Sequence, residues 1–171
     1  MRYNIAQDGK ADTRPRAAIS MTLMLRIAAE VNNLLAIRRF VQDAAAALAV
    51  PAPAIDDLVL AVDESITNVI EHGYRGQPGD VEIEVRRAGE TVVVHLRDRA
   101  PPFDPTGLPD PDLTLSLEER PVGRMGVFLT RQLVDAVTYR LTGEGGNELT
   151  LTKRAVTPQP TSQEIPHEHD H

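Results

Sequence analysis

The sequence has 171 residues, a formal net charge of −7 and no cysteine. This length suits one domain with short tails, and the lack of cysteine excludes disulfides and thiolate metal sites. An acidic chain is a poor fit to nucleic acid, no apolar run is long enough to span a bilayer, and residues 1–16 lack a signal-peptide core, so we expect a cytoplasmic protein that contacts neither nucleic acid nor membrane.

Two polar ends flank the part of the chain that carries regular patterning. We expect residues 1–20 to form a flexible leader, residues 21–155 one folded domain, and residues 156–171 a flexible tail. The last residues alternate histidine with acids, which is typical of either a metal-binding tract or a solvated tail. The composition favours the solvated tail.

The first half of the domain predicts one strand followed by two helices. Thr22–Ala28 is a short apolar stretch that we expect to be a strand. Asn32 or Asn33 is a candidate N-cap for a helix that Pro51 ends, and a second helix ends at Gly73. Apolar residues recur at helical spacing in both: Leu34, Ile37, Val41, Ala44 and Leu48, then Ile55, Leu58, Val59, Val62, Ile66, Val69 and Ile70.

The second half of the domain predicts two hairpins and a third helix. Apolar and polar residues alternate over 81–86, and a turn is expected at Ala88–Gly89. On the returning strand, one face is lined by Val92, Val94, Leu96 and Asp98. The Pro-rich stretch 99–122 has no evident long element, and loops of this length are uncommon unless they have a function. The remaining elements are a helix over 126–136 and strands over 137–141 and 148–153.

This order of elements predicts the fold class. It is typical of an α/β (α+β) two-layer sandwich, in which helices cover one face of a mostly antiparallel, mixed sheet. Strands and helices do not alternate as a Rossmann or P-loop fold requires. The phosphate-binding sequence GxxxxGK[ST] is also absent from the chain.

Two polar residues stand out on the second helix. Glu64 and Asn68 lie four residues apart, so their side chains are neighbours on the side opposite the apolar stripe. On this helix alone, the pair fits either a solvated polar face or a site.

Two later features favour the site. Asp98 ends a strand just before the long loop, and Gly123-Arg124-Met125-Gly126 opens a helix. Glycines allow the backbone to approach a ligand, and the N–H groups and dipole of a helix N-terminus favour a phosphate.

Three segments resemble the anti-sigma serine kinases of bacterial partner-switching systems. Glu64-Ser65-Ile66-Thr67-Asn68 is similar to the E-x-x-x-N box of the wider Bergerat-fold ATPases, which include gyrase, Hsp90, histidine kinases and MutL. The resemblance to the serine kinases extends over residues 63–74, 98–105 and 123–129. It covers residues 22–154, almost the whole expected domain.

The resemblance implies a Bergerat ATP-binding fold and a role for each motif. Asn68 would hold the Mg²⁺ that bridges the ATP phosphates, since an amide oxygen suits a hard cation. Glu64 would be the general base or the positioner for the attacking hydroxyl, and Asp98 would accept a hydrogen bond from the adenine amino group. Residues 99–122 would form a lid, mobile from 106 onward without nucleotide. The phosphate end would be closed by Gly123, Arg124, Met125 and Gly126.

One segment departs from the wider superfamily. Where that superfamily has D-x-G-x-G, this chain has Asp98-Arg99-Ala100-Pro101-Pro102, so both glycines are missing. Proline removes a backbone donor and fixes φ. We therefore expect the loop to fit adenine differently, and interpret the change as a trait of the anti-sigma subfamily.

Three functions remain open from the sequence. The first is a homodimeric serine kinase that sequesters a sigma factor and phosphorylates a small STAS-type antagonist. The second is a non-catalytic binding module, and the third is a switch kinase that acts on a scaffold protein. The presence of both Glu64 and Asn68 favours the two kinases, whereas fold-level likeness cannot name the partner.

The first helix carries two adjacent arginines, Arg38 and Arg39. Neighbouring residues point in different directions on a helix, so at least one should face solvent. They are either ordinary surface arginines or, as the resemblance allows, a cationic contact for an acidic partner.

Overall fold

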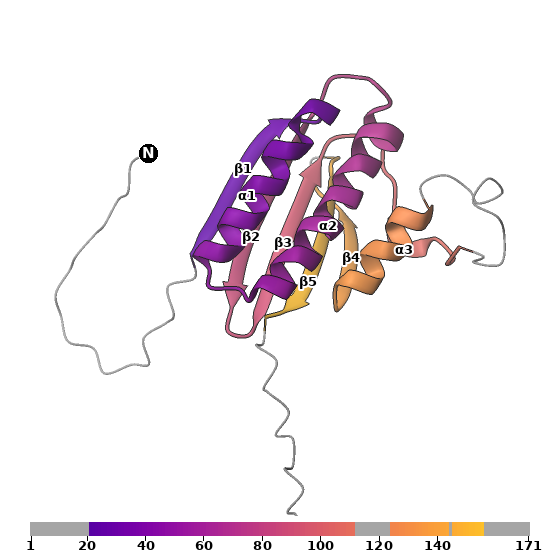
Figure 1. Cartoon of the computed structure of the whole chain (residues 1–171). Helices are drawn as coiled ribbons and strands as arrows, with labels where there is room; N and C mark the ends of the chain where they lie inside the picture. Colours follow the sequence, from indigo (N-terminus) through magenta and orange to yellow (C-terminus); the bar gives the residue numbers. More distant parts are fainter. Residues whose placement is uncertain (1–20, 112–123, 144, 156–171) are drawn as a thin grey trace, which may run out of the picture.

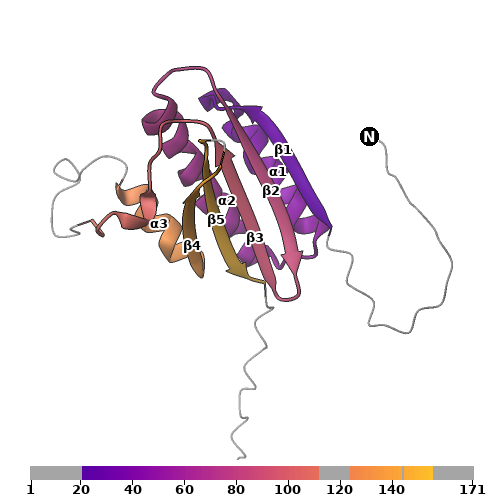
Figure 2. The ribbon, with the colours of Figure 1, turned by 180° about the vertical axis from the view of Figure 1, so that it is seen from behind.

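The computed structural model describes residues 21–111, 124–143 and 145–155. Its sheet has the strand order β1-β2-β3-β5-β4, and the helices cover one face (Figure 1). Seen from behind, the other face of the sheet carries no helix formed by the described residues (Figure 2). All four pairings between the described strands are antiparallel. The two-layer prediction is confirmed, whereas the prediction of a mixed sheet is wrong for these strands.

The elements lie close to their predicted positions. Among them are a 3₁₀ turn before the first helix and a six-residue π-helical turn after the second. The strands are β1 Thr22–Ala28, β2 Asp80–Ala88, β3 Thr91–Asp98, β4 Ala136–Leu141 and β5 Asn147–Arg154, and the helices are α1 Leu34–Ala47, α2 Ala52–Asn68 and α3 Arg124–Leu133.

Three helix ends differ from the prediction. Asn33 occupies the N-cap position of α1, yet its amide donates to the Ala28 carbonyl at 2.9 Å and does not cap the helix. The chain leaves α1 at Ala49, which has φ 55°, before it reaches Pro51. After α2 the π-helical turn Val69–Tyr74 runs past Gly73, and the left-handed residue that ends it is Arg75, with φ 52°.

The core lies between the sheet and the helices α1 and α2. Alternate residues of β2 and β3 point toward the helices and are fully or nearly fully buried, as the period of two predicted. Asp98 is the last residue of the inward-facing row that contains Val92, Val94 and Leu96. The carboxylate of Asp98 therefore lies at the end of β3, on the face of the sheet that packs against the helices. None of the helices within the described residues is long and apolar enough to cross a membrane.

Candidate functional site

A pocket with an empty volume of about 630 Å³ opens between α2, α3 and the ends of β3, β4 and β5. Its walls are mostly apolar, and a few polar side chains converge on it. These are Asn68, Asp98, Thr130, Arg131, Tyr139 and Asn147.

Asp98 is held at the floor of this pocket by two donors. The backbone N–H of Ala100 and the side-chain Nδ2 of Asn147 both donate to Asp98 Oδ1, each at 2.8 Å. Burial raises the pKa of Asp98 above its ordinary value, and these two hydrogen bonds only partly offset the effect. A fixed carboxylate in an apolar pocket is suited to accept a hydrogen bond from an N–H or O–H group of a ligand.

The loop after Asp98 packs against the π-helical turn that follows Asn68. A Cβ atom added to Gly73 would lie 2.9 Å from the Cβ of Ala100, closer than ordinary packing allows. Ala100 stands where the wider superfamily has its first glycine, so Gly73 leaves room for the extra methyl group. Tyr74 fixes the same corner, because its hydroxyl donates to Asp80 O at 2.8 Å and accepts from Arg99 N at 3.0 Å.

The predicted pair on α2 meets the first turn of α3. A Cβ on Gly126 would lie 2.5 Å from Glu64 Oε2 and 3.5 Å from Asn68 Nδ2. A side chain at position 126 would displace the flexible end of Glu64, so glycine lets α3 approach this carboxylate without that shift. A carboxylate beside a helix N-terminus is favoured by the helix dipole. The structure thus places Glu64 next to Gly126, while Asn68 faces the pocket shared with Asp98.

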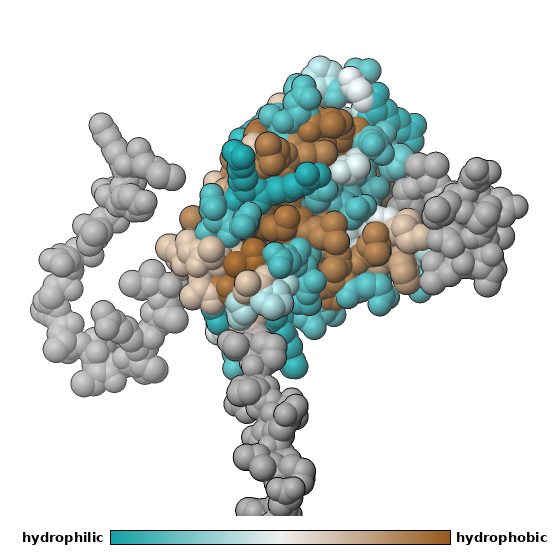
Figure 3. All heavy atoms as spheres, in the orientation of Figure 1, coloured by the Kyte–Doolittle hydropathy of each residue, from teal (hydrophilic) through white to brown (hydrophobic). Residues whose placement is uncertain are grey.

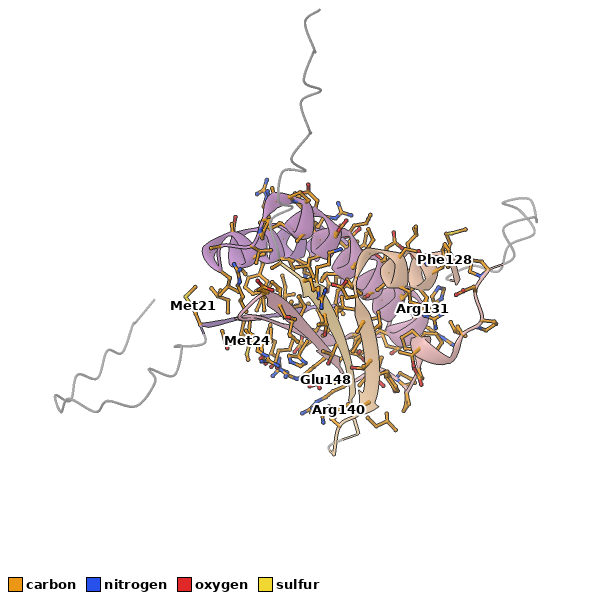
Figure 4. The ribbon with its side chains drawn as sticks, turned by 90° about the horizontal axis from the view of Figure 1, so that it is seen from below. Met21, Met24, Phe128, Arg131, Arg140 and Glu148 are labelled. Atoms are coloured by element: carbon orange, nitrogen blue, oxygen red, sulfur yellow. The ribbon has the colours of Figure 1, made fainter. Side chains whose placement is uncertain are left out.

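Arg131 fastens the start of the predicted lid to α3. Its guanidinium donates to three backbone carbonyls, Pro105 O at 2.9 Å, Thr106 O at 2.6 Å and Leu108 O at 2.9 Å, and to Asp110 Oδ1 at 3.2 Å. The side chain points from α3 toward this segment (Figure 4). Residues 106–110 therefore lie against α3, whereas the rest of the predicted lid, 112–122, falls outside the described residues.

Some predicted residues cannot be placed. Gly123 and the histidines of the tail lie outside the described residues. Arg124 is described only as the first residue of α3, and Met125 is half-buried in the same turn. Within the described ranges, no group of three or more histidine or acidic residues could hold a metal ion. A magnesium ion at Asn68 would therefore depend on water and phosphate oxygens for its other ligands, as is usual for this ion.

Sequence reasoning missed several residues of the pocket, among them Arg131, Tyr139 and Asn147. Tyr139 Oη donates to Asn147 Oδ1 at 2.7 Å, so both residues are linked to Asp98. The three residues lie on two strands and a helix far from Asp98 in sequence. No local pattern marks them.

Comparisons with known proteins show what this chain is similar to. The chain is 31% identical over 99 residues to the serine/threonine-protein kinase BtrW of Bordetella bronchiseptica, which covers 57% of this chain and 69% of that protein. It is 30% identical over 105 residues to the serine-protein kinase RsbW of Listeria monocytogenes, which covers 58% and 66%. The chain thus spans about two thirds of the length of these relatives.

A solved structure supports the fold. The crystal structure of the RsbU and RsbW domains of Rv1364c from Mycobacterium tuberculosis matches with a TM-score of 0.58 and 22% identity, over 81% of this chain and 33% of that one. A family profile described as the histidine kinase-like ATPase domain matches residues 27–153, which is well over half of the sequence. The chain therefore belongs to the family of histidine kinase-like ATPase domains.

Proposed function

We propose that this protein is an ATP-dependent protein-serine kinase that sequesters a sigma factor and phosphorylates a small STAS-type antagonist. The observation that carries the proposal is that Asp98 and Asn68 line one pocket, with Glu64 four residues before Asn68 on α2 and beside Gly126. The names of the relatives, serine-protein kinases, support the reaction type. A cytoplasmic location and a homodimer belong to the same proposal.

The pocket residues fit a magnesium–ATP complex. Asp98 would accept a hydrogen bond from the amino group of adenine, and the apolar walls would pack against the base. Asn68 would hold Mg²⁺, and the first turn of α3 would lie near the phosphates. Mg²⁺ supplies neutralisation of the charge that develops on the phosphate oxygens.

Glu64 would act on the hydroxyl of the target serine. As the serine oxygen forms its bond to the γ-phosphorus, the bond from that phosphorus to the β,γ-bridging oxygen breaks and ADP leaves. Glu64 takes the serine proton. Its place beside Gly126, in the first turn of α3, would put the carboxylate next to the γ-phosphate if the phosphates lie near that turn.

Asn68→Ala is expected to abolish the magnesium dependence of ATP binding, because it removes the one side-chain ligand proposed for the ion. Titration of ATP with and without Mg²⁺ measures this. The matched control is Thr67→Ala, which changes the neighbouring helix position and should keep the dependence. If Asn68→Ala binds ATP with an unchanged magnesium effect, Asn68 does not hold the ion.

Burial of Asp98 predicts a pH effect on ATP binding. Protonation neutralises the carboxylate and weakens it as a hydrogen-bond acceptor. Because burial raises the pKa of Asp98, this protonation occurs at a higher pH than for an exposed aspartate. ATP affinity should therefore fall as the pH is lowered, beginning at a higher pH than for an ordinary aspartate. Titrations at a series of pH values would show the fall, and a constant affinity down to the ordinary range of aspartate would contradict it.

The surface of α1 and α2 is the proposed contact for the partner. Apolar patches and polar residues are interspersed over these helices (Figure 3), and Leu35 and Leu60 are large exposed apolar side chains there. Arg38 forms a bidentate ion pair with Asp63 of α2, at 2.6 and 2.8 Å. Arg39 is exposed, and it has no hydrogen bond or ion pair among the described residues. Arg39 is thus the arginine with its charge available to an acidic partner.

Arg39→Glu is expected to abolish partner binding and leave ATP affinity unchanged. Arg38→Glu instead replaces the ion pair with Asp63 by two neighbouring carboxylates, so it should lower the melting temperature of the protein. Arg154→Glu, an exposed charge reversal on β5, serves as control. Partner titrations at two salt concentrations test this. Wild-type partner binding by Arg39→Glu would show that the arginine is a solvated bystander.

The partner and the reaction are tested together by one experiment. The protein is used to capture partners from its native host with and without ATP, and γ-labelled ATP is added to the captured material. We expect a sigma factor and a small antagonist, with label on a serine of the antagonist. Label on a scaffold protein would favour the switch kinase, and capture without any label would favour a binding module.

A further inference from the structure

Three side chains on neighbouring strands form a hydrogen-bonded chain at the floor of the pocket. Tyr139 of β4 donates to Asn147 Oδ1 of β5 at 2.7 Å, and Asn147 Nδ2 donates to Asp98 Oδ1 of β3 at 2.8 Å. Asn147 pairs directly with Asp98 in the β3–β5 register. The strand pairing itself thus sets the two side chains against each other.

The orientation of the Asn147 amide is fixed by its partners. Its Nδ2 lies 3.0 Å from the carbonyl oxygen of Ala100, which can only accept a hydrogen bond. The atom that faces this carbonyl must therefore be the nitrogen, and the amide oxygen is left to accept from Tyr139. An exchange of the two amide atoms would set oxygen against oxygen.

Asn147 has no further proton to donate. Its two N–H groups are taken by Asp98 and by the Ala100 carbonyl. The residue is 6% exposed, so water does not compete for these bonds. Asn147 therefore acts on a ligand through Asp98 and not through a donor of its own.

The same bonds fix the rotation of the Asp98 carboxylate. Asn147 and the Ala100 N–H both use Oδ1. Two donors from different directions on one oxygen define the plane of the group, so Oδ2 has a set direction in the pocket.

We propose that Asn147, oriented by Tyr139, is a positioning residue that aims Asp98 Oδ2 at the 6-amino group of bound adenine and so sets the selectivity for adenine nucleotides. This inference rests on the proposed function, because it requires that adenine binds in the pocket at Asp98. Tyr139 is placed one step farther from the base and supports the amide.

The test compares ATP with purine riboside triphosphate, which lacks only the 6-amino group. Calorimetry is run on the full chain as wild type, Asn147→Leu and Tyr139→Phe. Wild type should prefer ATP by about tenfold or more, the worth of a hydrogen bond to a charged group. Asn147→Leu should lose most of that preference, with the analogue bound about as well as by wild type, and Tyr139→Phe should lie between.

Tyr139→Phe guards against misfolding, since it removes one hydroxyl and keeps the ring. A melting curve for each variant shows whether it is folded. If ATP and the analogue weaken in parallel in both variants, or if both keep the wild-type preference, Asn147 supports the structure only and the inference is overturned. If wild type binds neither nucleotide, the proposed function itself fails, and the inference fails with it.

Discussion

Asp98→Asn is expected to lower the affinity for ATP by about 10- to 100-fold, since a hydrogen bond to a charged group is worth about 1.5 to 3 kcal/mol. The substitution keeps the size of the side chain but replaces an ionised acceptor with a neutral amide. It also weakens the pairing with Asn147 Nδ2, which now faces a neutral group. Both effects act on the carboxylate whose Oδ2 is proposed to bind adenine, one directly and the other through Oδ1.

Calorimetry with Mg·ATP measures this loss. Asp104→Asn is the matched control, because Asp104 is exposed and bonds only to Thr106 among the described residues. It should bind ATP like wild type. Wild-type ATP affinity in Asp98→Asn would show that Asp98 does not bind adenine, and the pocket would then have no residue assigned to the base.

Glu64→Gln is expected to keep ATP affinity and to lower phosphoryl transfer by about 100- to 10,000-fold, the usual contribution of a general base. A base acts mainly in the transition state, so its loss affects turnover more than binding. Glutamine has nearly the shape of glutamate, so the close contact with Gly126 is retained. Transfer from γ-labelled ATP to the purified antagonist measures the rate.

The control for Glu64→Gln is Glu71→Gln, which changes an exposed acid just after the same helix. It should transfer phosphate at the wild-type rate. Equal rates for Glu64→Gln and wild type would return Glu64 to the solvated face of α2, one of the two interpretations of the sequence.

Periodic segments of the fold were predictable, and the helix ends were not. In β2 apolar and polar residues alternate, and in β3 every second residue from Val92 to Leu96 is apolar, because one face of each strand packs on the core. Gly73 suggested a helix end because glycine adopts left-handed conformations. In the structure, Gly73 is needed because a side chain there would clash with Ala100. The residue with the left-handed conformation is Arg75. Arginine has no preference for that conformation, so the sequence carried no signal of the end.

The residues of the site likewise fall into a group that the sequence could predict and a group that it could not. Glu64 and Asn68 share a helix face, and Asp98 continues the inward row of its own strand, so local spacing was enough to select them. Asn147 reaches Asp98 across 49 residues of sequence, through the pairing of β5 with β3. Arg131 is likewise 21 to 26 residues from its partners in the loop. Such contacts depend on strand register and helix packing, which a single sequence does not specify.

The open face of the sheet was not predicted in any detail. There Arg97 donates to Glu148, Glu82 and Glu84, and Arg140 donates to the same Glu148 (Figure 4). Burial raises the pKa of Glu148, but the hydrogen bonds and charges of Arg140 and Arg97 outweigh it and hold the pKa below its ordinary value. Alternate strand positions explain this network, because residues opposite each other on adjacent strands lie on the same face.

The central claim is that the pocket at Asp98 and Asn68 binds Mg·ATP and selects adenine. Calorimetric titration of the wild-type chain with Mg·ATP, Mg·ADP and Mg·GTP tests it most directly. The account predicts saturable binding of ATP and ADP at one site per chain and no measurable binding of GTP. Equal affinity for ATP and GTP, or no binding of either adenine nucleotide, would contradict it.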